Sequence, residues 1–158
     1  TVGQIGTTCV PTMLRGGHAH NALPQSATVS VNCRIFPGVS VESVRDRLVE
    51  VVADPQARVT VLDDPAASDA SPLRADIVAA VTRAVHARAP GLPIVPSMSA
   101  GATDSLHFRA AGIPSYGVSA LFMRSEDSFA HGLNERVPLS AIDGVLVQWH
   151  VLLTELAK

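Results

Sequence analysis

The sequence predicts a mixed fold in which an α+β part is followed by an α/β part. Two strand-like runs, over residues 5–14 and 27–36, predict the first part. The second part is predicted by five segments that read helix, strand, helix, strand and helix in chain order. Because 47% of the residues are hydrophobic and 16% are charged, the composition is that of a chain with a packed core.

The charge and the hydropathy pattern exclude several classes of protein. The 158 residues carry a net charge of −2 and contain no basic run, which argues against nucleic acid or an anionic membrane as the partner. No apolar run approaches the roughly 18 residues of a membrane span. The first residues lack the basic and apolar parts of a signal peptide, and they read as the middle of a longer protein. The compartment stays open, with the cytoplasm slightly favoured.

The two strand-like runs predict an antiparallel hairpin. Pro11 cannot donate a hydrogen bond to a neighbouring strand, so the run over 5–14 is expected to lie at a sheet edge or to carry a bulge. In 27–36 apolar and polar residues alternate, as in a half-buried strand. The polar stretch between them makes a hairpin the simplest connection.

A helix and a third strand complete the first part. Ser40 is expected to cap a helix that ends near Ala53, because apolar residues recur at helical spacing between them. Residues 57–62 read as a short strand. The order strand, strand, helix, strand makes up most of a ferredoxin-like split βαβ unit, and it leaves a sheet edge uncovered.

The stretch 63–70 reads as a linker and divides the chain into a domain over 1–64 and a domain over 65–158. In the second domain Ser71 and Pro72 are expected to start the first helix. The alternation of helices and strands predicts a parallel α/β layer. Helices are predicted at 71–88, 104–111 and 139–156, and short strands at 93–96 and 115–118.

Cys9 and Cys33 are the two cysteines of the chain, and both lie in strand-like runs. They form no Cys-x-x-Cys pattern and no disulfide framework. The favoured interpretation is two small buried apolar side chains. A cross-strand disulfide requires that the hairpin bring the two cysteines opposite each other.

His131 is the first candidate for a functional residue. It lies between a loop and a helix, beside Gly132, which permits close approach of the backbone. A lone loop histidine is more often simply solvated, and no second ligand stands at helical spacing. A metal at His131 would need its other ligands from far along the sequence or from another chain.

Two further candidates are weaker. The backbone N–H groups of Gly101, Ala102 and Thr103 precede a helix and could hold a carboxylate or an oxyanion, although a helix start capped by Thr103 or Asp104 explains them equally well. Arg34 offers a planar fork that suits a carboxylate, and Asn21 lies in the turn of the same hairpin. An arginine on the polar face of a strand is the simpler interpretation. His18 and His20 are expected to be exposed.

These motifs in series resemble one family, the co-catalytic zinc amidohydrolases. The run from Gly17 to Arg34 resembles the family's lid hairpin, 101–104 resembles its pocket loop, and His131–Glu135 resembles its His-x-x-Asn-Glu motif. The family comprises the aminoacylase, carboxypeptidase G and succinyl-diaminopimelate desuccinylase relatives, the M-twenty metallopeptidases. The resemblance covers nearly the whole chain in the right order.

The resemblance implies hydrolysis of an amide bond next to a free carboxylate, as in an N-acyl amino acid, a dipeptide or a carbamoyl amino acid. It implies two zinc ions that activate water, with His131 as one ligand and a glutamate general base upstream of Thr1. Asn21 and Arg34 would reach the substrate from the lid, and Gly101, Ala102 and Thr103 would line its pocket. The lid implies a homodimer formed through its sheet edge.

The sequence also departs from the family. Asn32 stands where the family has an aspartate, and Ala102 replaces a hydroxyl residue. The family's other zinc ligands would precede Thr1, so we expect the C-terminal part of an enzyme that is inactive alone and needs a further segment or chain. A non-catalytic dimerisation module and a metal-free anion-binding domain are the alternatives.

Overall fold

The computed structural model describes residues 2–158, which fall into two compact units. One unit is formed by the described residues up to Ser71 together with Ser97–Ser115, and the other by Pro72–Pro96 with Tyr116–Lys158. The predicted domains 1–64 and 65–158 stay a prediction, because compact units within one chain do not define the domains of a longer protein.

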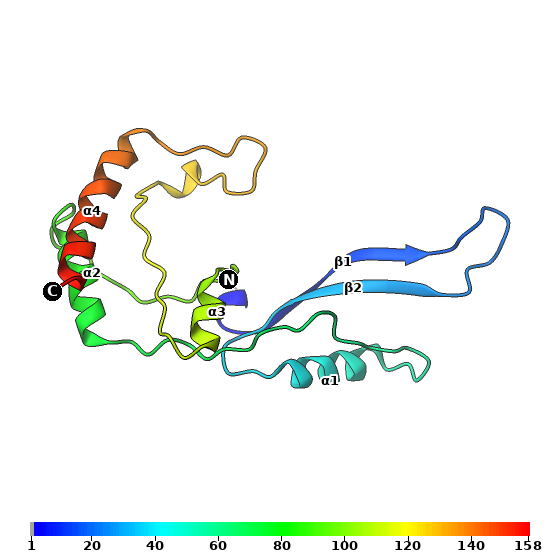
Figure 1. The fold of residues 1–158 in the computed structure, drawn as a ribbon. Helices are drawn as coiled ribbons and strands as arrows, with labels where there is room; N and C mark the ends of the chain where they lie inside the picture. The colour runs from blue at the N-terminus through cyan, green and yellow to red at the C-terminus, as the bar shows by residue number, and fades with distance from the viewer. Residues whose placement is uncertain (1) are drawn as a thin grey trace. The chain divides into compact units, whose positions relative to one another are not determined.

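The first unit is built on the predicted hairpin, which is confirmed. β1 (Thr8–Gly16) pairs antiparallel with β2 (Ala27–Arg34), and the two form a long two-stranded ribbon (Figure 1). The register shifts between Pro11 and Met13. This irregularity is the predicted bulge, since proline has no N–H to offer the neighbouring strand. β1 begins three residues later than predicted and continues into the turn.

Cys9 and Cys33 face each other in this register and form a disulfide, with their Cα atoms 4.1 Å apart. The favoured interpretation of two buried thiols is therefore wrong. The antiparallel register places the two cysteines opposite each other, and Cys9 is exposed.

Removing the disulfide is expected to destabilise the hairpin. The bond closes a loop between residues 24 apart in sequence. The chain-entropy model gives about 3 kcal/mol for a loop of that size. Urea unfolding of the Cys9→Ala/Cys33→Ala double variant should show a correspondingly lower midpoint than the oxidised protein. Adding a reductant should lower the midpoint of the wild type and leave that of the double variant unchanged; equal midpoints throughout would contradict the expectation.

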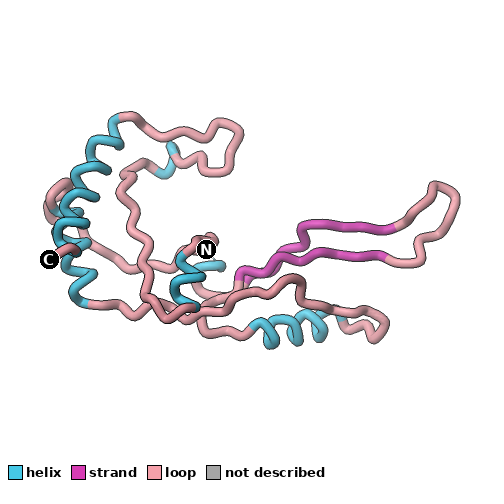
Figure 2. The backbone as a smooth tube through the Cα atoms, viewed as in Figure 1, coloured by secondary structure: helices cyan, strands magenta, loops and turns pink. Residues whose placement is uncertain are grey.

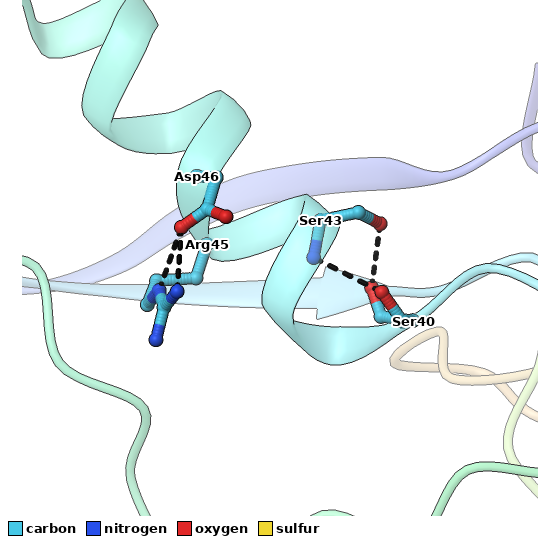
Figure 3. Close-up of polar contacts among 4 residues, drawn as sticks. All are labelled: Ser40, Ser43, Arg45 and Asp46. Atoms are coloured by element: carbon cyan, nitrogen blue, oxygen red, sulfur yellow. Dashed lines mark hydrogen bonds and ion pairs between the residues drawn. The ribbon is translucent and has the colours of Figure 1, made fainter.

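α1 (Val41–Val52) confirms the predicted helix and its cap. The Ser40 hydroxyl accepts a hydrogen bond from the backbone N–H of Ser43 at 3.1 Å, and the Ser43 hydroxyl donates back to the Ser40 carbonyl at 2.8 Å (Figure 3). The first of these bonds satisfies one helix N–H group, that of Ser43, which has no intrahelical partner. Arg45 and Asp46 form an exposed ion pair at 2.6 Å, also drawn in Figure 3. Such a pair adds little stability in water.

The second unit is built on two helices, α2 (Ala75–His86) and α4 (Ser140–Leu156), which pack against each other. Ala80, Ala84 and Leu152 form the centre of this packing. Arg83 of α2 and Glu155 of α4 form an ion pair at 2.8 Å between the two helices. A hydrogen bond from Lys158, together with the charge of Arg83, lowers the pKa of the Glu155 carboxyl below its usual value.

α2 begins at Ala75, so the predicted start at Ser71 is wrong. The Ser71 hydroxyl, which was expected to cap the helix, instead accepts a hydrogen bond from the Ser115 N–H at 2.9 Å and donates to the Ser115 carbonyl at 2.8 Å. Because its hydroxyl is occupied in this way, it ties two distant segments of the chain together. α3 (Ser105–Ala110) and α4 begin and end close to the predicted positions.

The mixed α+β class is confirmed, but the three predicted short strands are not formed within residues 2–158. Residues 57–62, 93–96 and 115–118 run as loop (Figure 2), so the described chain contains no parallel layer. A strand requires a neighbouring strand, and none of these segments has one. Prolines at both ends of 93–96 also remove N–H donors.

The chain exposes much more surface than a closed fold of its size. Its accessible surface is 12257 Å² for a mass of 16.5 kDa. The scaling for folded monomers gives about 7,500 Å² for one compact body and about 9,100 Å² for two separate compact halves. Within residues 2–158 the buried side chains belong to the second unit alone. Many large hydrophobic side chains, among them Leu23, Leu133 and Leu139, are exposed as well, which is typical of a chain that packs against further protein.

Candidate functional site

His131 lies on the surface of the second unit, in the long segment between residue 122 and α4. It is exposed, and its backbone adopts the left-handed conformation, with φ at 64°. Few residues other than glycine adopt this conformation without support from their surroundings. The turn around His131 is closed by a hydrogen bond from the Gly132 N–H to the Phe129 carbonyl at 2.8 Å.

A second contact closes the same turn. The Arg136 guanidinium lies over the ring of Phe129, with its Cζ 4.0 Å from the ring centroid. The Glu135 N–H donates to the Gly132 carbonyl at 3.3 Å. His131 therefore lies in a turn whose flanking residues, Phe129 and Arg136, contact each other. Its own imidazole forms no hydrogen bond or ion pair within residues 2–158.

The hairpin carries Asn21 and Arg34 at its opposite ends. Asn21 lies in the exposed turn, and Arg34 is the last residue of β2, opposite Thr8. At about 3.3 Å per residue, β2 alone spans more than roughly 20 Å. One small substrate therefore cannot contact both side chains of the same hairpin, and their joint role stays a prediction. The guanidinium of Arg34 has no hydrogen bond or ion pair to any part of the chain that the structure describes.

The predicted pocket loop lies in the first unit, before α3. The Gly101 N–H donates a hydrogen bond to the Ser99 hydroxyl at 3.2 Å. One of the three backbone N–H groups expected to bind a ligand is therefore already paired within the loop. Neither Thr103 nor Asp104 caps the helix with its side chain, although the alternative interpretation expected this. Ala102 and Thr103 are exposed, and the substrate contact assigned to this loop stays a prediction.

The described residues 2–158 do not form a zinc site among themselves. No group of three or more histidine, cysteine, aspartate or glutamate side chains in residues 2–158 could hold a metal. A zinc site requires at least three protein ligands, and His131 supplies one imidazole. His18 and His20 are exposed at the hairpin turn, as expected. Zinc bound at His131 would thus depend on ligands that this chain does not provide.

Two residues with structural roles, Gln148 and Arg88, were not identified from the sequence. Gln148 is 1% exposed on α4 and donates from Nε2 to the Ser119 carbonyl at 3.0 Å, which holds that segment against the helix. Its Oε1 has no hydrogen-bond partner in the described part of the chain. Arg88, just beyond α2, contacts three parts of the second unit. Gln148 could have been noticed in the sequence, because it is a polar residue within the apolar pattern of α4. No feature of the sequence pointed to Arg88.

None of the helices described in residues 2–158 has the length and apolar character needed to cross a bilayer.

Comparison of this chain with known proteins points to the same family as the motifs in its sequence. Residues 3–60 match the family model of the peptidase dimerisation domain. Over 153 residues, 96% of its length, the chain is 31% identical to an N-fatty-acyl-amino acid synthase/hydrolase of Xenopus tropicalis. The chain spans 30% of the length of that relative. No solved structure matches it. The chain is thus similar to the M-twenty peptidases, a family of hydrolases, and residues 3–60 match the family's dimerisation domain.

Proposed function

We propose that this chain is part of a zinc-dependent hydrolase that cleaves an amide bond adjacent to a free carboxylate, and that an N-acyl amino acid is the substrate. The similarity along 96% of the chain to an N-fatty-acyl-amino acid synthase/hydrolase carries this proposal. The motif series from Asn21 to Glu135 supports it. We expect the chain alone to be inactive, because residues 2–158 contain no group of side chains that could complete a zinc site.

Within the proposed enzyme each candidate residue has one role. His131 is a zinc ligand on a turn that Phe129 and Arg136 hold in shape. Arg34 binds the substrate carboxylate, for which its guanidinium is free and exposed. Asn21 reaches the substrate from the lid hairpin of a second copy of the chain, because one small substrate cannot contact Arg34 and Asn21 of the same hairpin. The loop 101–103 lines the pocket. The general base and the other zinc ligands come from residues outside this chain.

The proposed assembly is a homodimer formed through the hairpin. β1 and β2 form a two-stranded sheet, so the outer edge of each strand has backbone N–H and C=O groups with no strand beside them among residues 2–158. Such edges pair readily with another strand. The exposed apolar residues of the ribbon, including Val10, Leu14, Val29 and Val31, would be covered in that assembly.

The disulfide favours an oxidising compartment over the cytoplasm that the sequence slightly favoured. Cys9 is exposed, and stable disulfides in exposed positions are rare in reducing compartments. Thiol trapping before lysis of the native cells decides this point. Protection of both cysteines from alkylation supports the oxidising compartment, and labelling of both refutes it.

The experiment that tests the function combines intact mass, zinc content and hydrolysis of N-acyl amino acids on the same native sample. We expect the chain by itself to hold no zinc and to be inactive. We expect the complete polypeptide, or the chain with its partner segment, to hold about two zinc ions and to lose activity on chelation. Absence of hydrolysis in a complete, zinc-loaded sample would refute the proposed reaction.

A non-catalytic dimerisation module is the second candidate. It is favoured by the match of residues 3–60 to the dimerisation domain and by the single imidazole that this chain could give to zinc. The same sample distinguishes the two candidates. A complete native protein that dimerises, holds no zinc and hydrolyses no N-acyl amino acid would be such a module.

A further inference from the structure

Arg88 joins the two ends of the segment that carries His131. Its Nη1 donates a hydrogen bond to the carbonyl oxygen of Ala120, and its Nη2 lies 3.5 Å from the carbonyl oxygen of Ala141. Residues 121–140 lie between these two carbonyls, and His131 lies in their middle. All of these residues belong to the second unit.

A third contact fixes the same guanidinium. Its Cζ lies 4.1 Å from the centroid of the Phe122 ring, which is cation–π distance. The guanidinium is half-buried, and its planar fork allows it to reach two carbonyls and one ring at once. Lysine has a single ammonium group and could not make all three contacts.

Gly144 supplies independent support for this arrangement. It lies inside α4, where glycine is unfavourable because it costs more backbone entropy than alanine. A Cβ atom added at Gly144 would overlap Nε, Cζ and Nη2 of Arg88. The helix therefore has a glycine at the point where the Arg88 side chain crosses it.

The imidazole of His131 has no hydrogen bond or ion pair of its own in residues 2–158, so its position depends on the backbone that carries it. Fixing both ends of a long segment removes much of the conformational freedom that the segment would otherwise have. We propose that Arg88 is a positioning residue for His131, acting by holding Ala120 and Ala141 at the two ends of residues 121–140. The proposal deepens the function above and depends on it for its catalytic consequence.

The structural test measures hydrogen exchange over residues 123–138 and the backbone HN–Hα coupling and Cα shift of His131. In Arg88→Met we expect exchange to rise about tenfold, the scale of a lost hydrogen bond to a charged group. The spectroscopic signature of the left-handed His131 should be lost as well. Arg83→Met is the matched control, because Arg83 pairs with Glu155, near the C-terminal end of α4, whereas Arg88 contacts Ala141 near its N-terminal end. It should leave exchange in 123–138 unchanged.

Gly144→Ala gives a second route that keeps Arg88 in the chain. In the wild type the added Cβ should displace the guanidinium and raise exchange in 123–138, even though alanine favours the helix. In the Arg88→Met background the same change should only stabilise α4, because no guanidinium is there to displace. An equal effect of Gly144→Ala in the two backgrounds would overturn the proposal.

The functional readout uses the complete polypeptide. Arg88→Met should lower zinc affinity and kcat while leaving KM for the N-acyl amino acid nearly unchanged, since the residue touches no substrate. Arg88→Lys should recover part of the loss, and Arg83→Met should behave as the wild type. Unchanged exchange and an unchanged His131 signature in Arg88→Met would overturn the proposal whether or not zinc binds. A complete polypeptide that holds no zinc would instead refute the proposed function.

Discussion

Replacing His131 by alanine in the complete polypeptide is expected to remove zinc and to lower kcat/KM on an N-acyl amino acid by at least about 100-fold. Changes to groups that merely support a metal ligand cost 10- to 100-fold in affinity or activity, so loss of a ligand should cost at least the upper end of that range. The measurement is zinc content by elemental analysis together with kcat and KM on the same preparation.

His150→Ala is the matched control for this change. His150 is also an exposed histidine of the second unit, and it lies on α4, away from the turn that Phe129 and Arg136 close. Zinc content and activity should stay at the wild-type level in this variant. If His131→Ala keeps its zinc and its activity, His131 is not a ligand and the resemblance of the His131–Glu135 motif is misleading.

The local elements were predictable from sequence wherever the deciding interaction is local. The Ser40 cap, the hairpin and the bulge at Pro11 each follow from one or two neighbouring residues, and the structure contains all of them. The helix α4 follows from short-range periodicity in the same way. The propensity of a residue and its position in a periodic pattern are sufficient for features of this kind.

Features that depend on distant partners could not be predicted. The Ser71 hydroxyl was expected to cap a helix, but it binds the backbone of Ser115, 44 residues away. Cys9 and Cys33 could be paired only once the register was known. The three predicted strands fail for the same reason, because a strand is formed by its neighbour as much as by its own sequence. In the proposed enzyme those neighbours would come from residues outside this chain.

The candidate site also combines a feature that the sequence predicts with contacts that it does not. The sequence identified His131 through its motif, but the contacts that shape its turn join Phe129 to Arg136 and Arg88 to both ends of the segment. Cation–π contacts and hydrogen bonds to carbonyl oxygens leave little trace in the spacing of residues. A motif therefore locates a ligand, whereas the side chains that position it become visible only in the fold.

Replacing Arg34 by alanine is expected to raise KM for the N-acyl amino acid by at least about tenfold, with a smaller decrease in kcat. A hydrogen bond to a charged group contributes about 1.5–3 kcal/mol, and a bidentate contact with a carboxylate lies at the upper end of that range. Asn32, on the same strand, brings no negative charge that would compete for the guanidinium. Arg34→Lys should be intermediate, because lysine keeps the charge and loses the planar fork.

Two comparisons make the Arg34 experiment specific. Arg15 is exposed near the other end of the same hairpin, opposite Thr28, so Arg15→Ala removes an equal charge without touching the proposed contact. A substrate analogue with an amide in place of the carboxylate should be turned over equally by the wild type and by Arg34→Ala, because the interaction that distinguishes them is then missing from both. If Arg34→Ala weakens turnover of the amide analogue as much as that of the acid, Arg34 supports the hairpin rather than binding the carboxylate. A loss confined to the acid would assign the substrate's free carboxylate to Arg34.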